Sequence, residues 1–370
     1  MNNIMGIVFA SNIENKLNEL TIRRTPASLP FCGRYRLIDF TLSNFVNGGI
    51  TSIGILTKNN YNSLMEHIRM GRDWDLNRKN SGIAMFPPYA HNQSKEMYKD
   101  KIEAIYGIFN YLIKTKEEYV IITDSNIVAN IDYEDVYNYH IKNGADITML
   151  TYESKPTSLR RIVVDADNDM RVKDMYISTV SENSKKLLGL NIYLMRKDLL
   201  KSLIENAFAR GQTDFEKEVL FKKLGQLKII AYKCNGYAEI IDDIKSYYRE
   251  SMNLLDYNLR KDLFYKYGKI MTKVKDSIPT TYGDKANVSN SLIADGCTIN
   301  GTVENSILFR GVKVDEGSVI KNSIIMENGY VMSNVNISYA ILDKHVTVQE
   351  GRNISGYETY PVVIVKDKIV

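Results

Sequence analysis

The chain has 370 residues, long enough for two or three domains with a substantial core. With 44% hydrophobic and 25% charged residues, its composition is that of an ordinary globular protein and excludes extensive disorder. The net charge of +4, from 48 basic and 44 acidic residues, is too balanced to indicate a nucleic-acid-binding protein on electrostatic grounds.

The cysteines and the hydropathy predict a cytoplasmic protein. Cys32, Cys234 and Cys297 are far apart and lack metal-ligand spacing, which is typical of reduced thiols. No apolar stretch approaches the roughly twenty residues that a membrane span requires, and the first residues do not resemble a signal peptide. We therefore expect a soluble protein that binds neither membranes nor nucleic acid.

The opening segment predicts a buried strand that leads into a ligand site. Residues 4–10 are apolar and rich in Ile and Val, as in a parallel strand, and the loop 11–16 follows. In a doubly wound sheet this loop is where a nucleotide binds, and glycines allow its backbone N–H groups to approach phosphates. The loop has no glycine. Its position predicts a nucleotide site, whereas its residue types argue against one.

Alternating strand and helix patterns follow. We expect strands at 52–57, 119–123, 146–151, 189–195, 227–234 and 237–241, and helices at 36–47, 61–70, 102–114, 134–142, 197–210 and 215–224. Residues 162–177 predict a hairpin, and the polar segment 72–95 predicts a long loop. This alternation predicts an α/β domain with a mostly parallel, doubly wound, Rossmann-like sheet over residues 1–250.

The last part of the chain has a six-residue apolar repeat. After a helix at 246–264 and a linker at 269–284, which give a connecting region over 251–285, apolar residues recur every six positions. The rows are Leu308, Val314, Ile320 and Met326, then Val312, Ser318 and Ile324, and later Leu342, Val348 and Ile354. This period predicts a parallel β-helix over 286–370, and ordinary strands that happen to be in phase are the alternative.

Several segments together resemble the ADP-glucose pyrophosphorylase (glucose-1-phosphate adenylyltransferase) family. They include 31–49 (FCGRYRLIDFTLSNFVNGG), 54–57 (GILT), 67–76 (HIRMGRDWDL), 144–148 (GADIT) and 290–297 (NSLIADGC). The resemblance implies that the β-helix is left-handed. It also implies the family reaction, in which ATP and glucose 1-phosphate give ADP-glucose and pyrophosphate with the help of Mg²⁺.

The resemblance also implies that the phosphate-binding residues are lost. The family loop Gly-Gly-x-Gly-Thr-Arg-Leu corresponds to Ser11 to Leu17, where Glu14 adds a negative charge that would repel a triphosphate. The family arginine is replaced by Lys16, which lacks a bidentate fork. A family lysine corresponds to Pro26, which carries no charge.

Both metal carboxylates of the family are replaced in the same comparison. They correspond to Asn126 and Ile240, which give Mg²⁺ no anionic ligand. Asp124, at its strand end, is expected to point elsewhere, and Asp242 or Asp243 could restore the site if the chain slips by two or three residues. We therefore expect no catalytic residue, no metal and no cofactor, with Mg²⁺ bound only in the alternative case.

Other family positions are retained. Gly189, Asn191, Asp214 and Phe215 resemble remnants of the sugar-phosphate site, although these residues could equally be needed only for folding. The family lysine expected near 176–180 is absent.

Three arginines, Arg23, Arg24 and Arg36, match positions where the family binds anionic allosteric effectors, with a solvated charged surface as the alternative. The histidines His67, His91, His140 and His345 show no metal-ligand spacing and are expected to be structural.

The joint loss of the loop, the cations and the metal ligands favours a catalytically silent, regulatory subunit. The chain resembles the D-type subunit found beside a catalytic subunit in some bacterial glycogen pathways. Its expected partner is a catalytic glucose-1-phosphate adenylyltransferase subunit in a hetero-oligomer, with a tetramer as the expected form and self-association as the alternative. The alternatives are an active Mg²⁺-dependent nucleotidyltransferase that uses Asp124 or Asp242, and a hexapeptide-repeat acyltransferase that acts through His345.

Overall fold

A computed structural model describes residues 3–11, 16–79, 81–88, 98–155 and 159–370. The chain divides into two compact units. The first comprises residues 1–13, 40–240 and 263–271, and the second comprises residues 14–39, 241–262 and 272–370. Each unit is described by itself below.

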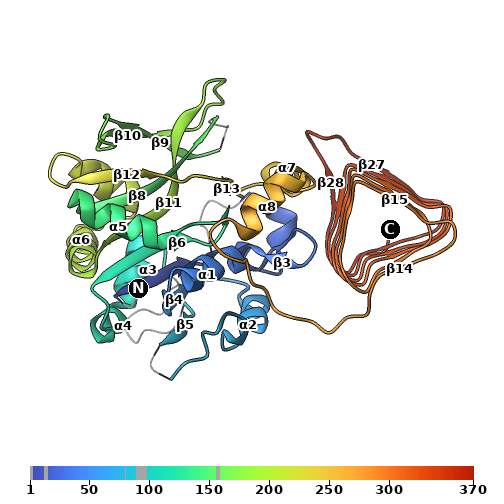
Figure 1. The fold of residues 1–370 in the computed structure, drawn as a ribbon, viewed down its shortest axis with the longest axis horizontal. Helices are drawn as coiled ribbons and strands as arrows, with labels where there is room; N and C mark the ends of the chain where they lie inside the picture. Colours follow the sequence, from blue (N-terminus) through green and yellow to red (C-terminus); the bar gives the residue numbers. More distant parts are fainter. Residues whose placement is uncertain (1–2, 12–15, 80, 89–97, 156–158) are drawn as a thin grey trace. The chain divides into compact units, whose positions relative to one another are not determined.

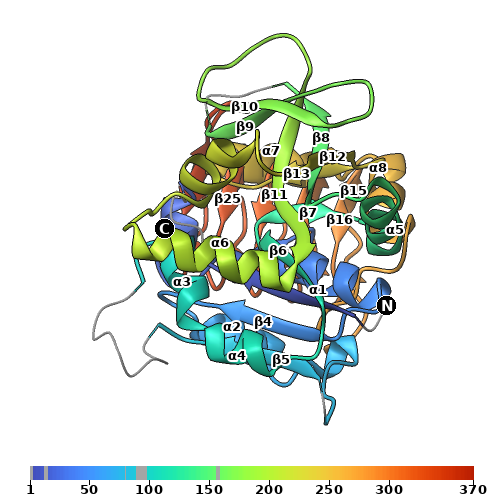
Figure 2. The same cartoon turned by 90° about the vertical axis from the view of Figure 1, so that its left-hand side faces the viewer.

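A nine-stranded mixed sheet forms the centre of the first unit (Figure 2). On one side, parallel strands follow the order β5 (Gly82–Phe86), β4 (Ser52–Leu56), β1 (Ile4–Phe9) and β6 (Tyr119–Asp124). Strand β11 (Lys186–Arg196) joins β6 in the antiparallel direction. Beyond it lie β8 (Ile147–Ser154), β12 (Ile229–Lys233), β9 (Arg161–Ala166) and β10 (Val172–Ser178). The predicted α/β class and the β9–β10 hairpin are confirmed.

Helices cover both faces of this sheet, as the alternation of side chains in β1 shows. Met5, Ile7 and Phe9 belong to one buried cluster with residues of α3 (Lys101–Gly107), α4 (Phe109–Lys114) and α6 (Lys197–Ala209). Gly6 faces the other side, where a Cβ would lie 2.5 Å from the Phe45 ring of α1 (Leu37–Asn47). Phe45 in turn packs on Tyr133 of α5 (Tyr133–Asn143), with 5.3 Å between ring centroids.

Three expected elements differ from the structure. The segment 72–95, predicted as a loop, contributes β5, whose short apolar run GIAMF pairs with β4 at the edge of the sheet. The expected helix 102–114 is two helices, α3 and α4. The expected helix 246–264 is also divided, into α7 (Ile244–Asn253) and α8 (Tyr257–Tyr265). In both cases the helical period continues across the break, so periodicity alone could not reveal it.

The second unit contains the predicted left-handed β-helix, built from three five-stranded parallel sheets (Figure 1). The first sheet contains β14 (Thr281–Tyr282), β17 (Thr298–Ile299), β20 (Lys313–Val314), β23 (Tyr330–Val331) and β26 (Thr347–Val348). The second contains β15 (Asn287–Ser289), β18 (Thr302–Glu304), β21 (Val319–Lys321), β24 (Asn336–Ser338) and β27 (Asn353–Ser355). The third contains β16 (Leu292–Ile293), β19 (Ile307–Leu308), β22 (Ile324–Ile325), β25 (Ala340–Leu342) and β28 (Val362–Ile364).

The six-residue period follows from the three sides of each coil. Leu308, Val314 and Ile320 lie on successive sheets and are all buried in the interior. Along one sheet, Val314 pairs with Ile299 in the coil before it and with Val331 in the coil after it. The interpretation as ordinary strands in phase is therefore wrong. The first coil also begins earlier than expected, because β14 lies within the predicted linker 269–284.

The division into units differs from the expected boundaries at 250 and 285. Residues 14–39, which contain the short strands β2 (Pro30–Phe31) and β3 (Tyr35–Arg36), belong with the β-helix, as do residues 241–262. Tyr247 of α7 donates a hydrogen bond of 2.8 Å to the Pro30 carbonyl, and Tyr248 donates one of 2.6 Å to the Asn322 carbonyl. These side-chain contacts join segments that are distant in the sequence.

The buried His140 makes the stability of the first unit sensitive to acid. Its Nδ1 lies 2.8 Å from the Thr148 hydroxyl, and burial lowers its pKa from 6.5 to about 4, against the opposing effect of Asp146. The unfolded chain therefore binds this proton more readily than the folded one. The stabilising contribution of the neutral His140 ring is therefore fully present above pH 6.5. It decreases as the pH falls towards 4, which lowers the free energy of unfolding by about 3 kcal/mol in total.

We expect His140→Gln to flatten this dependence in denaturant titrations between pH 6.5 and pH 4. His345→Gln is the matched control, because His345 lies exposed in a turn of the β-helix, and its acid dependence should equal that of the wild type. An unchanged slope in His140→Gln would contradict the assignment of the acid sensitivity to this ring.

Candidate nucleotide and metal site

The structure describes only some residues of the predicted nucleotide loop after β1. Ser11 accepts a hydrogen bond of 3.1 Å from the Lys58 backbone N–H, whereas residues 12–15, including Glu14, lie outside the described residues. Lys16 is exposed, and its backbone N–H donates to the Asp242 carbonyl at 2.9 Å. Pro26 is buried at the start of the helical turn Pro26–Ser28 and supplies no positive charge.

The two positions implied to have lost metal carboxylates lie close together in the first unit. Strand β7 (Ile127–Ala129) pairs in the antiparallel direction with β13 (Ala238–Ile240), and Ile240 stands opposite Ile127. Asn126 immediately precedes Ile127, and both Asn126 and Ile240 are almost completely buried. An amide and an aliphatic side chain thus occupy this place, and neither provides a negative charge for a metal ion.

The aspartates that could have restored a metal site have other contacts. Asp243 caps α7, because its Oδ1 accepts a hydrogen bond of 2.7 Å from the Ser246 backbone N–H. The Ser246 hydroxyl completes this capping box at the other end. Asp242 stands just before the cap and holds the Lys16 backbone through its carbonyl.

A buried polar cluster, which we call the Lys101 centre, lies at the end of β6. It consists of Lys101, Asp124, Asn191 and Glu216, from the start of α3, the end of β6, the middle of β11 and the short helix Phe215–Leu220. Lys101 Nζ donates to Asp124 Oδ2 at 3.1 Å and to Glu216 Oε1 at 3.0 Å. Asn191 Nδ2 also donates to Asp124 Oδ2, at 3.1 Å.

The surroundings of the Lys101 centre favour a charged ammonium group. Burial opposes the charge, but attraction to Asp124 and Glu216 outweighs it and raises the pKa of Lys101 above its usual range. The Phe9 ring adds a cation–π contact, with its centroid 5.4 Å from Nζ. Asp124 thus has Lys101 as its ionic partner at the end of β6.

The four predicted sugar-phosphate remnants have different roles in the structure. Asn191 belongs to the Lys101 centre. Gly189 allows close packing in β11, because a Cβ there would lie 2.2 Å from the Met149 side chain. Asp214 caps the helix Phe215–Leu220 and forms an ion pair of 2.7 Å with Arg160. Phe215 is buried against Tyr193. Packing and capping thus explain three of the four in the described structure.

The residues of the Lys101 centre do not fit a magnesium site. Mg²⁺ requires oxygen ligands, usually carboxylates, in an octahedral arrangement. Asp124 and Glu216 are the acidic members of the centre, and both accept hydrogen bonds from the Lys101 ammonium group. Within the described part of the chain, no group of three or more His, Cys, Asp or Glu side chains could hold a metal ion.

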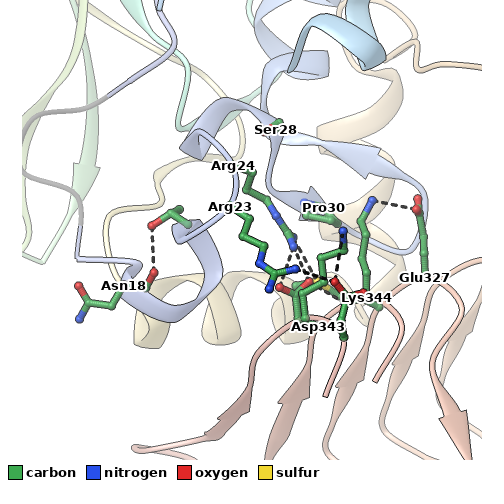
Figure 3. A network of polar contacts seen from close by, with 12 residues as sticks. Asn18, Arg23, Arg24, Ser28, Pro30, Glu327, Asp343 and Lys344 are labelled. Carbon is green, nitrogen blue, oxygen red and sulfur yellow. Dashed lines mark hydrogen bonds and ion pairs between the residues drawn. The ribbon is translucent and has the colours of Figure 1, made fainter. Parts of the chain in front are cut away.

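The predicted effector arginines lie in the second unit, where two of them form ion pairs with the β-helix (Figure 3). Arg24 Nη2 lies 2.7 Å from both carboxylate oxygens of Asp343, and both side chains are buried. Arg23 Nη1 lies 2.7 Å from Asp367 Oδ2 at the surface. Arg24 is thus held by an internal partner.

A second ion pair accompanies Arg24 on the same face of the coil (Figure 3). Lys344 Nζ donates to Glu327 Oε2 at 2.8 Å. Burial opposes the charge on Glu327, but attraction to Lys344, Lys275 and Arg36 lowers its pKa to about 2. Burial also lowers the pKa of Lys344 to about 8, which Glu327 opposes and Arg36 reinforces. Positive charge therefore exceeds negative charge around Glu327.

Comparisons with known proteins agree with this architecture. Residues 6–255 match the nucleotidyl transferase family, and residues 277–359 match the GlmU-like C-terminal hexapeptide family. The chain is 33% identical over 366 residues to the glycogen biosynthesis protein GlgD of Bacillus subtilis. The aligned region covers 99% of this chain and 96% of that protein. The chain belongs to the glucose-1-phosphate adenylyltransferase family.

Two further members of this family support the assignment. The glucose-1-phosphate adenylyltransferase of Bacillus mycoides is 32% identical over 351 residues, with 94% of this chain and 93% of that protein covered. The enzyme of Geobacillus stearothermophilus is 32% identical over 321 residues, with 86% and 83% covered. The similarity thus includes both the nucleotidyl transferase region and the β-helix of the family.

Within this family member, the sequence analysis missed Lys101 and Glu216. Lys101 stands directly after Asp100, which caps α3, and Glu216 stands directly after the retained Asp214 and Phe215. Neither has a spacing that distinguishes it among the 48 basic and 44 acidic residues of the chain. Their importance follows only from the fold, which brings two segments that are far apart in the chain to the end of β6.

Proposed function

We propose that this chain is a regulatory, catalytically silent subunit of glucose-1-phosphate adenylyltransferase in cytoplasmic glycogen biosynthesis. It would join a catalytic subunit, in a hetero-oligomer such as a tetramer, and change the activity or effector response of that subunit. The observation that carries the proposal is the Lys101 centre, in which the ammonium group of Lys101 pairs with Asp124, at the end of β6, and with Glu216.

Three other positions support the same function. Asn126 precedes the strand that pairs with the strand of Ile240, neither side chain carries a negative charge, and Pro26 supplies no cation for phosphates. A nucleotidyl transfer needs cations around the phosphates and carboxylates that hold a divalent metal ion. The cations and carboxylates replaced in this chain would all serve that one reaction, while the sheet and the β-helix remain intact.

The alternative is an active Mg²⁺-dependent nucleotidyltransferase with a rearranged metal site. Asp124 and Asp242 are its candidate ligands. It is less well supported, since Asp124 accepts hydrogen bonds from both Lys101 and Asn191. An acyltransferase that acts through His345 is also less well supported, because His345 is an exposed turn residue with a left-handed backbone, φ 59°.

An anionic effector would be expected at the remaining positive charge of the second unit. Arg23 is exposed, and Arg36 adds to the positive excess around Glu327 and Lys344. Arg24 would act indirectly, by fixing the segment that carries these residues to Asp343. The allosteric role of all three arginines remains a proposal.

The proposal is tested by measuring turnover with ATP, glucose 1-phosphate and Mg²⁺. We expect no turnover by this chain alone, and a change of about 5- to 150-fold in the apparent substrate or effector affinity of the catalytic subunit on mixing, which corresponds to a coupling of roughly 1–3 kcal/mol. Light scattering coupled to size-exclusion chromatography would show the mixed oligomer directly.

The control replaces the catalytic subunit by a variant without its metal-binding carboxylates. This mixture should form the same oligomer but show no turnover. Turnover that persists would come from this chain and would establish the active alternative. An unchanged catalytic subunit, with no mixed oligomer, would overturn the regulatory part of the proposal.

A further inference from the structure

The ammonium group of Lys101 lies where carboxylate oxygens from two segments converge. Nζ is 3.0 Å from Asp124 Oδ1, 3.1 Å from Asp124 Oδ2 and 3.0 Å from Glu216 Oε1. In proteins, oxygen ligands surround Mg²⁺ and Ca²⁺ at about 2.0–2.6 Å. The same three oxygens would need to move inward by roughly 0.5–1 Å to surround a divalent ion. The position of Nζ is therefore that of a cation between two carboxylates.

The charges of the centre explain why the lysine and a metal ion exclude each other. Asp124 and Glu216 carry two negative charges, and their side chains are only 3% and 7% exposed. Lys101 compensates one charge from within the chain, without the loss of translational freedom that a free ion would suffer. A divalent ion at this position would meet the ammonium group at close range, where two positive charges repel strongly in a poorly solvated site.

The two oxygens of Asp124 differ in their contacts. Asn191, at a left-handed backbone position with φ 56°, donates to Asp124 Oδ2 and fixes that carboxylate. The other oxygen, Asp124 Oδ1, is buried and receives no hydrogen bond from the described residues, although Nζ lies 3.0 Å away. One carboxylate oxygen therefore faces the cation through charge alone, which leaves it available to a metal ion if the lysine is removed.

We propose that Lys101 is the resident cation of this chain, whose ammonium group occupies the place between Asp124 and Glu216 and keeps a divalent metal ion out of it. The lysine converts a pair of carboxylates with the chemistry of a metal site into an internal ion pair. This assignment concerns the isolated chain and does not depend on the regulatory role proposed above.

The test removes the ammonium group and measures the response to Mg²⁺ in the full chain. Lys101→Met leaves two buried carboxylates without their cation, so without metal we expect a melting temperature roughly 5–10 °C lower than that of the wild type. Added Mg²⁺ should then raise the melting temperature in a saturable manner, because it binds the folded state only. The wild type should show no saturable shift and no heat of Mg²⁺ binding in calorimetry.

Two variants control the measurement. Lys114→Met makes the same change at the exposed end of α4 and should behave as the wild type does. Adding Asp124→Asn and Glu216→Gln to Lys101→Met should abolish the Mg²⁺ response. If Lys101→Met does not fold without metal, its refolding yield is measured instead, and recovery in Mg²⁺ supports the proposal.

Two results would overturn the proposal. One is the absence of any Mg²⁺ effect on the stability or refolding of Lys101→Met. The other is saturable Mg²⁺ binding by the wild type that Asp124→Asn or Glu216→Gln weakens. The mixing assay with a catalytic subunit is a separate measurement, so a failure of this proposal can be distinguished from a failure of the regulatory proposal.

Discussion

Replacing Arg24 with methionine is expected to lower the free energy of unfolding by about 3–5 kcal/mol, because it leaves Asp343 as a buried and uncompensated charge. In this pair one guanidinium nitrogen, Nη2, lies 2.7 Å from both carboxylate oxygens, and the side chains are 5% and 2% exposed. In the variant, the Asp343 carboxylate would keep one hydrogen bond from the described residues, that of 2.7 Å from the Lys344 backbone N–H. Denaturant titration followed by circular dichroism would measure the loss.

Arg23 provides the matched control for this experiment. Its ion pair with Asp367 has the same 2.7 Å distance, but the side chains are 62% and 43% exposed. Exposed pairs contribute only about 0–1 kcal/mol, because water and salt screen them. Arg23→Met should therefore be nearly neutral. Equal effects of the two substitutions would show that burial does not set the strength of the Arg24 pair.

A double variant distinguishes the loss of the ion pair from the cost of leaving one buried charge without its partner. Replacing Arg24 with methionine and Asp343 with leucine removes both charges, and the double variant should recover most of the stability lost in Arg24→Met. If it is no more stable than Arg24→Met, the loss comes from packing of the arginine stem and not from an isolated carboxylate.

The fold could be predicted from the sequence where one physical pattern dominates. The six-residue rows around Leu308, Val314 and Ile320 identified the β-helix, because each coil must bury one apolar side chain per side. The apolar runs of β1 and β6 identified central strands for a similar reason. Strand β5 was missed, since its glycine start and edge position give it no such buried run.

The site could be predicted only in part. Asn126 and Ile240 were identified by their correspondence to the family's metal carboxylates, and the structure brings their segments together through the pairing of β7 with β13. Lys101 and Glu216 could not be found, because an ion pair between distant segments leaves no periodic signal. Similarly, Arg24 was expected to bind a free anion, whereas the fold provides Asp343 as its partner. Local patterns report burial, but they do not report which charges meet.

An acidic residue at position 126, where the family resemblance implies a lost metal ligand, is expected to destabilise the chain and to give no turnover. Asn126→Asp conserves shape but places a carboxylate at a position that is only 2% exposed, two residues from Asp124. We expect a loss of about 2–4 kcal/mol at pH 8, since a buried carboxylate is penalised by desolvation and by the negative charge of Asp124. Denaturant titration at several pH values would measure it.

The pH dependence distinguishes this charge effect from a packing defect. Burial raises the pKa of a carboxyl group in the folded state, so the folded variant binds its proton more tightly than the unfolded chain does. The variant should thus approach wild-type stability at low pH and fall behind as the pH rises above about 4. Asn206→Asp in α6, at an exposed position, should change stability by less than about 0.5 kcal/mol at every pH.

Turnover with ATP, glucose 1-phosphate and Mg²⁺ should stay absent in Asn126→Asp, because Ile240 still supplies no second carboxylate. Measurable turnover would show that a single substitution separates this chain from a working nucleotidyltransferase.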